Sequence, residues 1–238
     1  ARSCVHLKAI VNITTDKCYE NDGRSEGYKE DDKMGGYDPY SSSKGCAEIV
    51  ASAYRRSFLQ DQGVGLASVR AGNVIGGGDW ANDRLIPDIL RSFEKSEPVV
   101  IRNPKATRPW QHVLEPLSGY LILAQKLYED QKEYAEGWNF GPNEKDVKPV
   151  DWILNKMISK WPNSSWELDQ NSSPHEASFL KLDISKAESR LGWKPVWGLS
   201  QTLEKIIAWH RAWIDKKDMQ AVCLSEIKEY TNDMNNEV

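Results

Sequence analysis

Residues 8–15 limit the possible fold more than any other stretch of the chain. Their sequence, Lys-Ala-Ile-Val-Asn-Ile-Thr-Thr, is apolar and β-branched at positions that would face both sides of a sheet. This pattern is typical of a central strand in a parallel sheet that helices cover on both faces. A helix is predicted over residues 39–59 and a second strand over residues 66–70. Strand, helix and strand in this order predict a piece of a doubly wound α/β sheet.

The pattern changes after residue 72, where short helices and strands alternate with loops. We therefore expect residues 1–72 to form the sheet part, residues 73–216 to form mainly a smaller mixed α/β domain, and residues 217–238 to be a polar, loosely held tail. The elements predicted in the second part are helices at 84–93, 113–128, 150–161 and 199–214, strands at 98–101 and 137–143, and a loop at 107–112.

A glycine-rich turn that could cradle a dinucleotide is missing from the sequence. No Gly-x-Gly-x-x-Gly run opens a helix after a predicted strand; Gly63-Val64-Gly65 precedes a strand, and residues 76–78 are predicted to form a flexible turn. The first strand already ends in residues typical of an active site. We therefore expect the first half of the sheet to be absent, which at roughly 30 residues per β-α-β unit amounts to about a hundred residues.

Composition excludes several classes of partner. A net charge of −4 gives no basic surface for nucleic acid or an anionic membrane, and no apolar run approaches the ~18 residues that a membrane span requires. The four cysteines have no Cys-x-x-Cys spacing, so neither a metal site nor a disulfide framework is predicted. The N-terminus has no signal-peptide pattern and lacks an initiator methionine. A reduced cytoplasm is the expected location.

Polar residues at two points predict a reactive site. Thr15, Asp16 and Lys17 follow the first strand, and ligands of open α/β sheets bind just beyond the carboxyl ends of strands. Tyr40 and Lys44 are four residues apart on a predicted helix, which places the phenol beside the ammonium. The positive charge would lower the pKa of the phenol from about 10 towards a value that suits a general base. Taken alone, a tyrosine and a lysine at this spacing could also be an ordinary solvated surface pair.

Five motifs in one order resemble those of a known family, the extended short-chain dehydrogenase/reductases, which include nucleotide-sugar epimerases and dehydratases. The resemblance covers about residues 9–213 and is greatest to the members that dehydrate CDP-glucose, which show Thr-Asp-Lys where dTDP-glucose dehydratases have Thr-Asp-Glu. The motifs are Ile13-Thr14-Thr15-Asp16-Lys17, Tyr40-x-x-x-Lys44, Arg70-Ala71-Gly72-Asn73-Val74, Arg108-Pro109-Trp110-Gln111-His112 and Trp138-Asn139-Phe140-Gly141.

The resemblance implies a reaction and a role for each residue of the site. NAD would take a hydride from carbon 4 of the hexose, water would leave across carbons 5 and 6, and the hydride would return to carbon 6. Tyr40 would be the base at the carbon 4 hydroxyl, helped by Thr15, while Lys44 would hold the nicotinamide ribose. Asp16 would protonate the leaving hydroxyl. Lys17 would act in the elimination, as a neutral amine base or as a fixed charge, unless it is a plain surface lysine.

The resemblance also implies which residues hold the cofactor and the nucleotide sugar. Residues 1–72 would be what remains of the NAD-binding domain, with Val74 as a further cofactor contact. Asn73 and Arg108 would bind the diphosphate, with Asn139 as a third contact. Arg102 is expected either to select a pyrimidine or to be an ordinary exposed arginine. The other expected substrate contacts are Arg84, Leu85, Val100 and His175; the alternative for His175 is a plain surface loop.

Other interpretations remain open at this stage. A UDP-N-acetylglucosamine 4,6-dehydratase of the inverting type also shows Thr-Asp-Lys, but the long charged loop before Tyr40 and the Arg-Pro-Trp-Gln-His run favour the CDP-glucose branch. An epimerase, a dTDP-glucose dehydratase or a non-catalytic interaction module are further alternatives. The resemblance implies a homodimer through the Tyr40 helix and a role in deoxysugar biosynthesis for lipopolysaccharide O-antigen.

Overall fold

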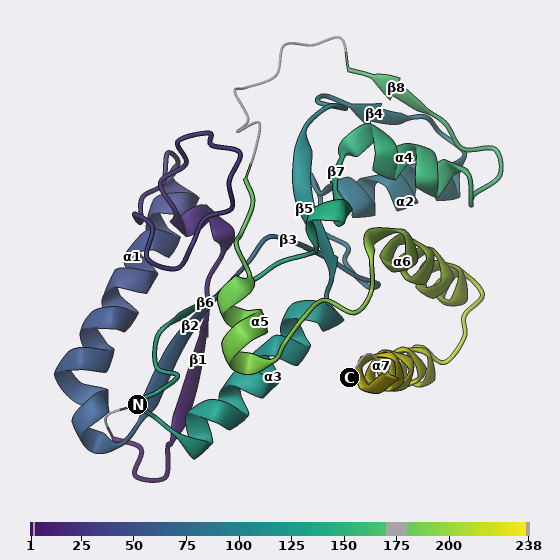
Figure 1. Ribbon diagram of the computed structural model, residues 1–238. Coiled ribbons are helices and arrows are strands. Elements are labelled where there is room, and N and C mark those ends of the chain that lie inside the picture. The colour runs from purple at the N-terminus through teal and green to yellow at the C-terminus, as the bar shows by residue number, and fades with distance from the viewer. Residues whose placement is uncertain (2, 170–179, 237–238) are drawn as a thin grey trace. The chain divides into compact units, whose positions relative to one another are not determined.

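The computed structural model describes residues 1, 3–169 and 180–236, which form two compact units (Figure 1). Unit 1 contains Ala1–Gly72, Glu115–Gly141 and Phe179–Lys194, and unit 2 contains the remaining segments. The break after residue 72 coincides with the expected domain boundary. Beyond that point the units are not continuous ranges, because residues 115–141 and 179–194 pack with the first 72 residues.

Unit 1 is built on a three-stranded parallel sheet. Its strands are β1 (Ala9–Ile13), β2 (Gly65–Ala71) and β6 (Gly137–Phe140), in the order β1-β2-β6. Helix α1 (Pro39–Tyr54) covers one face, and α3 (Leu114–Glu129) and α5 (Ser185–Leu191) cover the other (Figure 1). The predicted α/β class, with a parallel sheet between helices, is confirmed.

The sequence of β2 explains how it holds both layers of helices. All seven residues are buried, and alternate side chains point to opposite faces. Leu66 packs with Ala51 of α1, whereas Ala67 and Val69 pack with Leu123 of α3. The same alternation places Arg70 on the α1 side, where its guanidinium meets a carboxylate of that helix.

Short helical segments connect these elements. The first is the single turn η1 (Asp16–Cys18) after β1, and α1 continues into the π-helical turn η2 (Arg55–Leu59) and the turn η3 (Gln60–Gln62). The predicted helix over residues 39–59 therefore corresponds to α1 and η2 together.

Unit 2 is a smaller mixed α/β arrangement. Its sheet has the order β3-β5-β7, with β3 (Asn73–Ile75) parallel and β7 (Val147–Pro149) antiparallel to β5 (Thr107–His112); a separate pair joins β4 (Val99–Ile101) to β8 (Trp166–Leu168). One apolar cluster includes Ile89 of α2, Ile153 of α4 and Ile206 of α6. The remaining helical elements of this unit, with their bounds, are α2 (Leu85–Lys95), η4 (Glu144–Asp146), α4 (Val150–Ile158), α6 (Leu199–Ile214) and α7 (Met219–Asn236).

Two predictions about unit 2 were wrong. The expected loop over residues 107–112 is strand β5, whose polar side chains become buried because β3 and β7 pair with its two edges. The expected polar tail is helix α7, which is anchored by Tyr230, edge-on to the ring of Trp197 with the two centroids 5.0 Å apart. No described helix is both long enough and apolar enough to cross a membrane.

Candidate active site

The strand-end residues lie where the sequence predicts, in the turn that follows β1. Thr15 caps η1: its hydroxyl oxygen accepts from the backbone N–H of Lys17 at 3.4 Å and the hydroxyl donates to Asp16 Oδ1 at 3.0 Å. Thr15 and Asp16 are buried, while Lys17 is exposed. The turn therefore offers one exposed cation beside a buried carboxyl group that accepts a hydrogen bond from its neighbour.

Tyr40 and Lys44 lie together in the first turns of α1. Asp38 begins this helix, because its carboxylate accepts from the backbone N–H groups of Tyr40 at 2.9 Å and Ser41 at 3.1 Å. The hydroxyl of Ser41 also donates to Asp38; this hydrogen bond, together with those from the backbone, lowers the pKa of Asp38, and the charge of nearby Lys17 acts in the same direction. The Lys44 ammonium is 5.8 Å from the centre of the Tyr40 ring, and 53% of Tyr40 is exposed. The phenol is thus accessible to a ligand and lies next to a positive charge.

Two glycines allow α1 to pack closely against the strand-end turn. A Cβ at Gly45 of α1 would lie 2.8 Å from the carbonyl oxygen of Gly35 and 3.5 Å from that of Cys18 in η1. Gly36 has φ +147°, and a Cβ there would lie 2.3 Å from the backbone nitrogen of Ser42. Small residues at these points bring the helix that carries Tyr40 into direct contact with the turn that carries Asp16.

A buried polar network lies under this site, and sequence reasoning missed it. The carboxylate of Glu48 accepts two hydrogen bonds from Arg70, from Nε at 2.9 Å and from Nη2 at 3.0 Å. Arg70 Nη1 also donates to the hydroxyl oxygen of Tyr19 at 2.6 Å, and the Thr14 hydroxyl donates to Glu48. An arginine inside a buried strand was the available signal, because a buried charge requires a partner.

Burial and charge compete in this network. Burial alone would raise the pKa of Glu48, but the hydrogen bonds and charge of Arg70, with the Thr14 hydroxyl, outweigh it and lower that pKa. For Tyr19 the balance is opposite: burial raises the pKa of its phenol in spite of the adjacent guanidinium. Glu48 is therefore held as a carboxylate and Tyr19 as a neutral phenol.

Asn139 belongs to the same network. It is fully buried in β6; its side-chain oxygen accepts from Tyr19 at 2.8 Å, and its side-chain nitrogen donates to the carbonyl oxygens of Tyr28 at 2.8 Å and Asp183 at 3.2 Å. Because both ends of the amide bind protein groups, the geometry favours a structural role for Asn139 over the substrate contact expected from the sequence.

The remaining expected contacts lie in unit 2, at three places. Asn73 and Val74 are in β3 and Arg108 is in β5 of the same sheet, where Asn73 pairs with Trp110. The other positions are Arg84 and Leu85 at the start of α2, Val100 in β4 and the exposed Arg102 directly after it. His175 lies outside the described residues. The proposed catalytic residues therefore lie in unit 1, and all but one of the described residues expected only to bind substrate or cofactor lie in unit 2.

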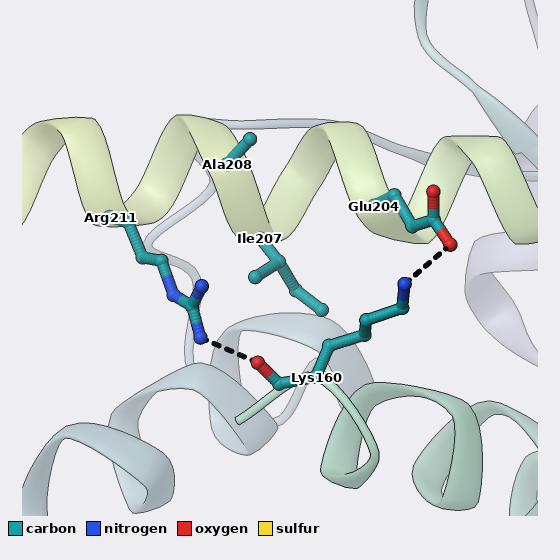
Figure 2. Close-up of a pocket in the computed structure, with 5 residues that line it drawn as sticks. All are labelled: Lys160, Glu204, Ile207, Ala208 and Arg211. Carbon is teal, nitrogen blue, oxygen red and sulfur yellow. Dashed lines mark hydrogen bonds and ion pairs between the residues drawn. The ribbon is translucent and has the colours of Figure 1, made fainter. Parts of the chain in front are cut away.

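A cavity of about 180 Å³ lies elsewhere in unit 2, beside α6, and contains none of the expected residues. Figure 2 shows its lining, where Lys160 points towards Glu204 and Arg211 towards the carbonyl of Lys160. The Lys160 Nζ to Glu204 Oε1 distance is 3.2 Å. Lys160 is paired with Glu204, whereas the guanidinium of Arg211 is bound to a neutral backbone carbonyl.

Known proteins with this fold place the chain in a class. Residues 1–206 match the family described as GDP-mannose 4,6 dehydratase, so the chain belongs to that family. It is 59% identical over 231 residues to a CDP-glucose 4,6-dehydratase of Salmonella typhimurium, a match that covers 94% of this chain and 64% of that protein. The chain thus spans less than two thirds of the length of this relative.

Solved structures with the same fold are more distant in sequence. The dTDP-glucose 4,6-dehydratase of Bacillus anthracis, in complex with NAD, superposes with a TM-score of 0.70 at 20% identity, covering 84% of this chain and 61% of that one. The UDP-glucuronic acid 4-epimerase of Bacillus cereus, in complex with UDP-glucuronic acid and NAD, gives 0.70 at 22% identity, with 88% and 64% covered. Both similarities establish the Rossmann-type fold of the chain.

Proposed function

We propose that the chain takes part in the NAD-dependent dehydration of CDP-D-glucose to CDP-4-keto-6-deoxy-D-glucose. One observation carries the proposal: helix α1, which bears an accessible phenol and an ammonium, packs against a strand-end turn that holds a hydroxyl, a carboxyl and a second ammonium. This is the set of groups that oxidation at one carbon followed by elimination at the next requires. The relative from Salmonella typhimurium, named as a CDP-glucose 4,6-dehydratase, supports the choice of sugar nucleotide.

Each residue of unit 1 has a proposed role in proton transfer. Tyr40 takes the proton of the carbon 4 hydroxyl while Thr15 hydrogen-bonds the same oxygen, and the charge of Lys44 attracts the negative charge that develops on the phenol. Lys17 acts at carbon 5, either as a neutral amine that removes the proton or as a cation that stabilises the resulting enolate. Asp16 gives a proton to the hydroxyl that leaves carbon 6, which requires that it be protonated when substrate is bound.

The nucleotide-sugar contacts are proposed for unit 2 by residue type. The guanidinium of Arg108 and the amide of Asn73, on neighbouring strands of one sheet, suit the diphosphate. Arg84, Leu85, Val100 and Arg102 are proposed to contact the base, and His175 to contribute a further contact.

The residues present fit one part of an NAD site. Tyr40 and Lys44, which lie together on α1, are proposed to hold the nicotinamide ribose, with Val74 as a further cofactor contact; when bound, NAD would supply the acceptor and donor of the hydride. The part that binds pyrophosphate is not found among the described residues, because β1 leads into η1 and β2 leads through Gly72 into β3, with no glycine turn opening a helix after either. We propose that the part of the relatives that this chain does not span supplies that turn.

The 238-residue chain alone is expected to bind NAD weakly. Without the helix N-terminus that carries the pyrophosphate, most of the affinity is lost. The measurement is a thermal unfolding titration with NAD, in which we expect no shift of the midpoint at millimolar cofactor. A clear stabilisation at micromolar NAD would contradict this prediction and place a complete site within the chain.

The substrate assay tests the proposed function itself. The full-length protein is incubated with NAD and, in separate reactions, with CDP-, dTDP-, UDP- or GDP-glucose, and the 4-keto product is scored by its absorbance in alkali. We expect turnover to be fastest with CDP-glucose. Preference for another nucleotide would refute the substrate, and a 4-epimer product would point to an epimerase.

The setting of the protein is also a proposal. The four cysteines are free in the structure, which supports a reducing, cytoplasmic location. Ile49, Val50 and Tyr54 expose apolar surface on α1, which supports a homodimer through this helix. A pathway that makes deoxysugars for lipopolysaccharide O-antigen would use the proposed product.

A further inference from the structure

A hydrogen bond joins the strand end directly to the helix that carries Tyr40. The hydroxyl of Thr14, the residue before Thr15, donates to Glu48 Oε1 of α1 at 2.5 Å, while its backbone N–H donates to the carbonyl of Val69 in β2 at 2.9 Å. The hydroxyl also lies 3.1 Å from the same carbonyl oxygen of Val69, but its shorter contact is with Glu48. Thr14 thus joins the central strand of the sheet to the helix.

Glu48 is fixed at the other end by Arg70. The guanidinium binds both carboxylate oxygens, and each side chain is only 5% exposed. Such a two-point contact between planar groups fixes orientation as well as distance. Because β2 is the central strand of the sheet in unit 1, the carboxylate of Glu48 cannot move without moving Arg70 or breaking its hydrogen bonds.

The position of Glu48 on α1 connects this anchor to the proposed site. Glu48 follows Lys44 by four residues and Tyr40 by eight, so the three side chains lie on one face of the helix. The face that presents Tyr40 is therefore the face that Thr14 and Arg70 hold. The same threonine is covalently joined to Thr15, the residue proposed to act with Tyr40.

We propose that Thr14, Glu48 and Arg70 form a positioning network that sets where Tyr40 lies relative to Thr15 and Asp16. The inference rests on the proposed function, since it concerns the geometry of that reaction. Apolar packing alone would hold α1 on the sheet but would tolerate sliding, whereas hydrogen bonds fix the separation of their atoms. A displacement of about 1 Å in a site of this kind can cost roughly 10²-fold in rate.

The test removes the bond between strand end and helix and leaves the ion pair intact. In the full-length protein, Thr14→Val keeps the side-chain shape and is expected to lower kcat by about 10- to 100-fold, with KM changed by less than about threefold, because Thr14 touches no substrate in the proposal. Thr14→Ser restores the hydroxyl and is expected to restore kcat. A kcat of Thr14→Val within about twofold of wild type would overturn the proposal.

Thr202 provides the matched control. It is fully buried in α6 of unit 2, and its hydroxyl has no hydrogen-bond partner among the described residues. Thr202→Val makes the same chemical change without removing a bond, so kcat is expected to stay at the wild-type value. An equal fall in kcat for both variants would show a general effect of the substitution and would also overturn the proposal.

A second measurement separates this proposal from the proposed function. Hydrogen exchange of the backbone amides of residues 15–19 needs no activity; Thr14→Val is expected to raise their exchange rates by about tenfold while those of residues 46–54 stay unchanged. Absence of turnover by the wild-type protein with every nucleotide sugar would refute the proposed function alone. Unchanged exchange at residues 15–19 in Thr14→Val would refute the positioning network alone.

Discussion

Replacing Tyr40 with phenylalanine is expected to lower kcat for dehydration by about 10³-fold, because a general base contributes roughly 10² to 10⁴ to such reactions. The fold should remain intact, since Tyr40 is more than half exposed at the start of α1 and its backbone N–H, not its side chain, binds the capping carboxylate of Asp38. The measurements are kcat with CDP-glucose and the thermal unfolding midpoint, which should change by less than about 2 °C.

Tyr37 gives the control for this substitution. It lies three residues earlier, outside the helix, and is fully exposed. Tyr37→Phe removes a hydroxyl from the same region and is expected to leave kcat unchanged. If Tyr40→Phe retained more than about a tenth of the activity, the base would have to be another group, and the role given to Lys44 would fall with it.

The elements that the sequence predicts well are those whose local pattern matches their environment. All seven residues of β2 are buried, as its apolar pattern predicts, and an i, i+3, i+4 spacing of apolar residues indicates α4 and α6. β1 forms over the predicted residues, but it lies at an edge of the sheet in unit 1, with its first four residues partly buried and Ile13 exposed, and not in the centre as its pattern predicts. The order strand, helix and strand also predicts where the polar residues lie, because the carboxyl ends of the strands in a doubly wound sheet meet at one edge. Thr15, Asp16 and Lys17 could be located from this rule alone.

The elements that the sequence does not predict depend on a distant partner. Residues 107–112 have a polar, proline-containing sequence, and they form a strand because β3 and β7 lie beside them. Helix α7 contains one buried residue, Tyr230, and is held by the ring of Trp197 and by Glu226, whose Oε1 is 3.2 Å from Nε2 of His112. Neither partner can be chosen from the local sequence.

The residues of the candidate site divide in the same way, into those whose surroundings are set by local sequence and those whose surroundings are set by distant residues. The spacing of Tyr40 and Lys44 is local, so their proximity could be predicted. The partners of Asn139 come from Tyr19, Tyr28 and Asp183, which are far apart in the sequence, and only the fold shows that its amide is already occupied. Glu48 was overlooked because a glutamate on a helix is usually solvated, and its burial depends on Arg70 of a strand 22 residues later.

Removing the charge of Glu48 is expected to produce the largest loss of stability among the substitutions considered. Glu48→Gln leaves the Arg70 guanidinium buried without a carboxylate, and breaking a buried ion pair in this way costs about 3–5 kcal/mol. Glu133→Gln is the control: Glu133 is 59% and its partner Arg190 36% exposed, so solvent screens this pair and the cost should stay below about 1 kcal/mol. Urea unfolding followed by circular dichroism measures both.

A double substitution separates two contributions to the loss of stability: the loss of the ion pair itself and the cost of leaving one unpaired charge buried. Glu48→Leu combined with Arg70→Met leaves no unpaired charge in the core, and we expect it to be more stable than either single variant. A double variant less stable than both singles would show that the pair itself, with its bonds to Thr14 and Tyr19, stabilises the fold more than apolar packing can.

The difference in stability between wild type and Glu48→Gln is expected to depend on pH in one direction. The pKa of Glu48 is lower in the folded chain than its usual value of about 4.3, so the ion pair contributes its full stability above that value and loses it as the pH falls through the folded pKa. The free energy of unfolding of wild type minus that of Glu48→Gln should therefore be constant from pH 7 to about pH 5 and shrink towards pH 3. A difference that stayed constant down to pH 3 would contradict the assignment of Glu48 as a paired, buried carboxylate, because a group with equal proton affinity in both states gives no pH dependence.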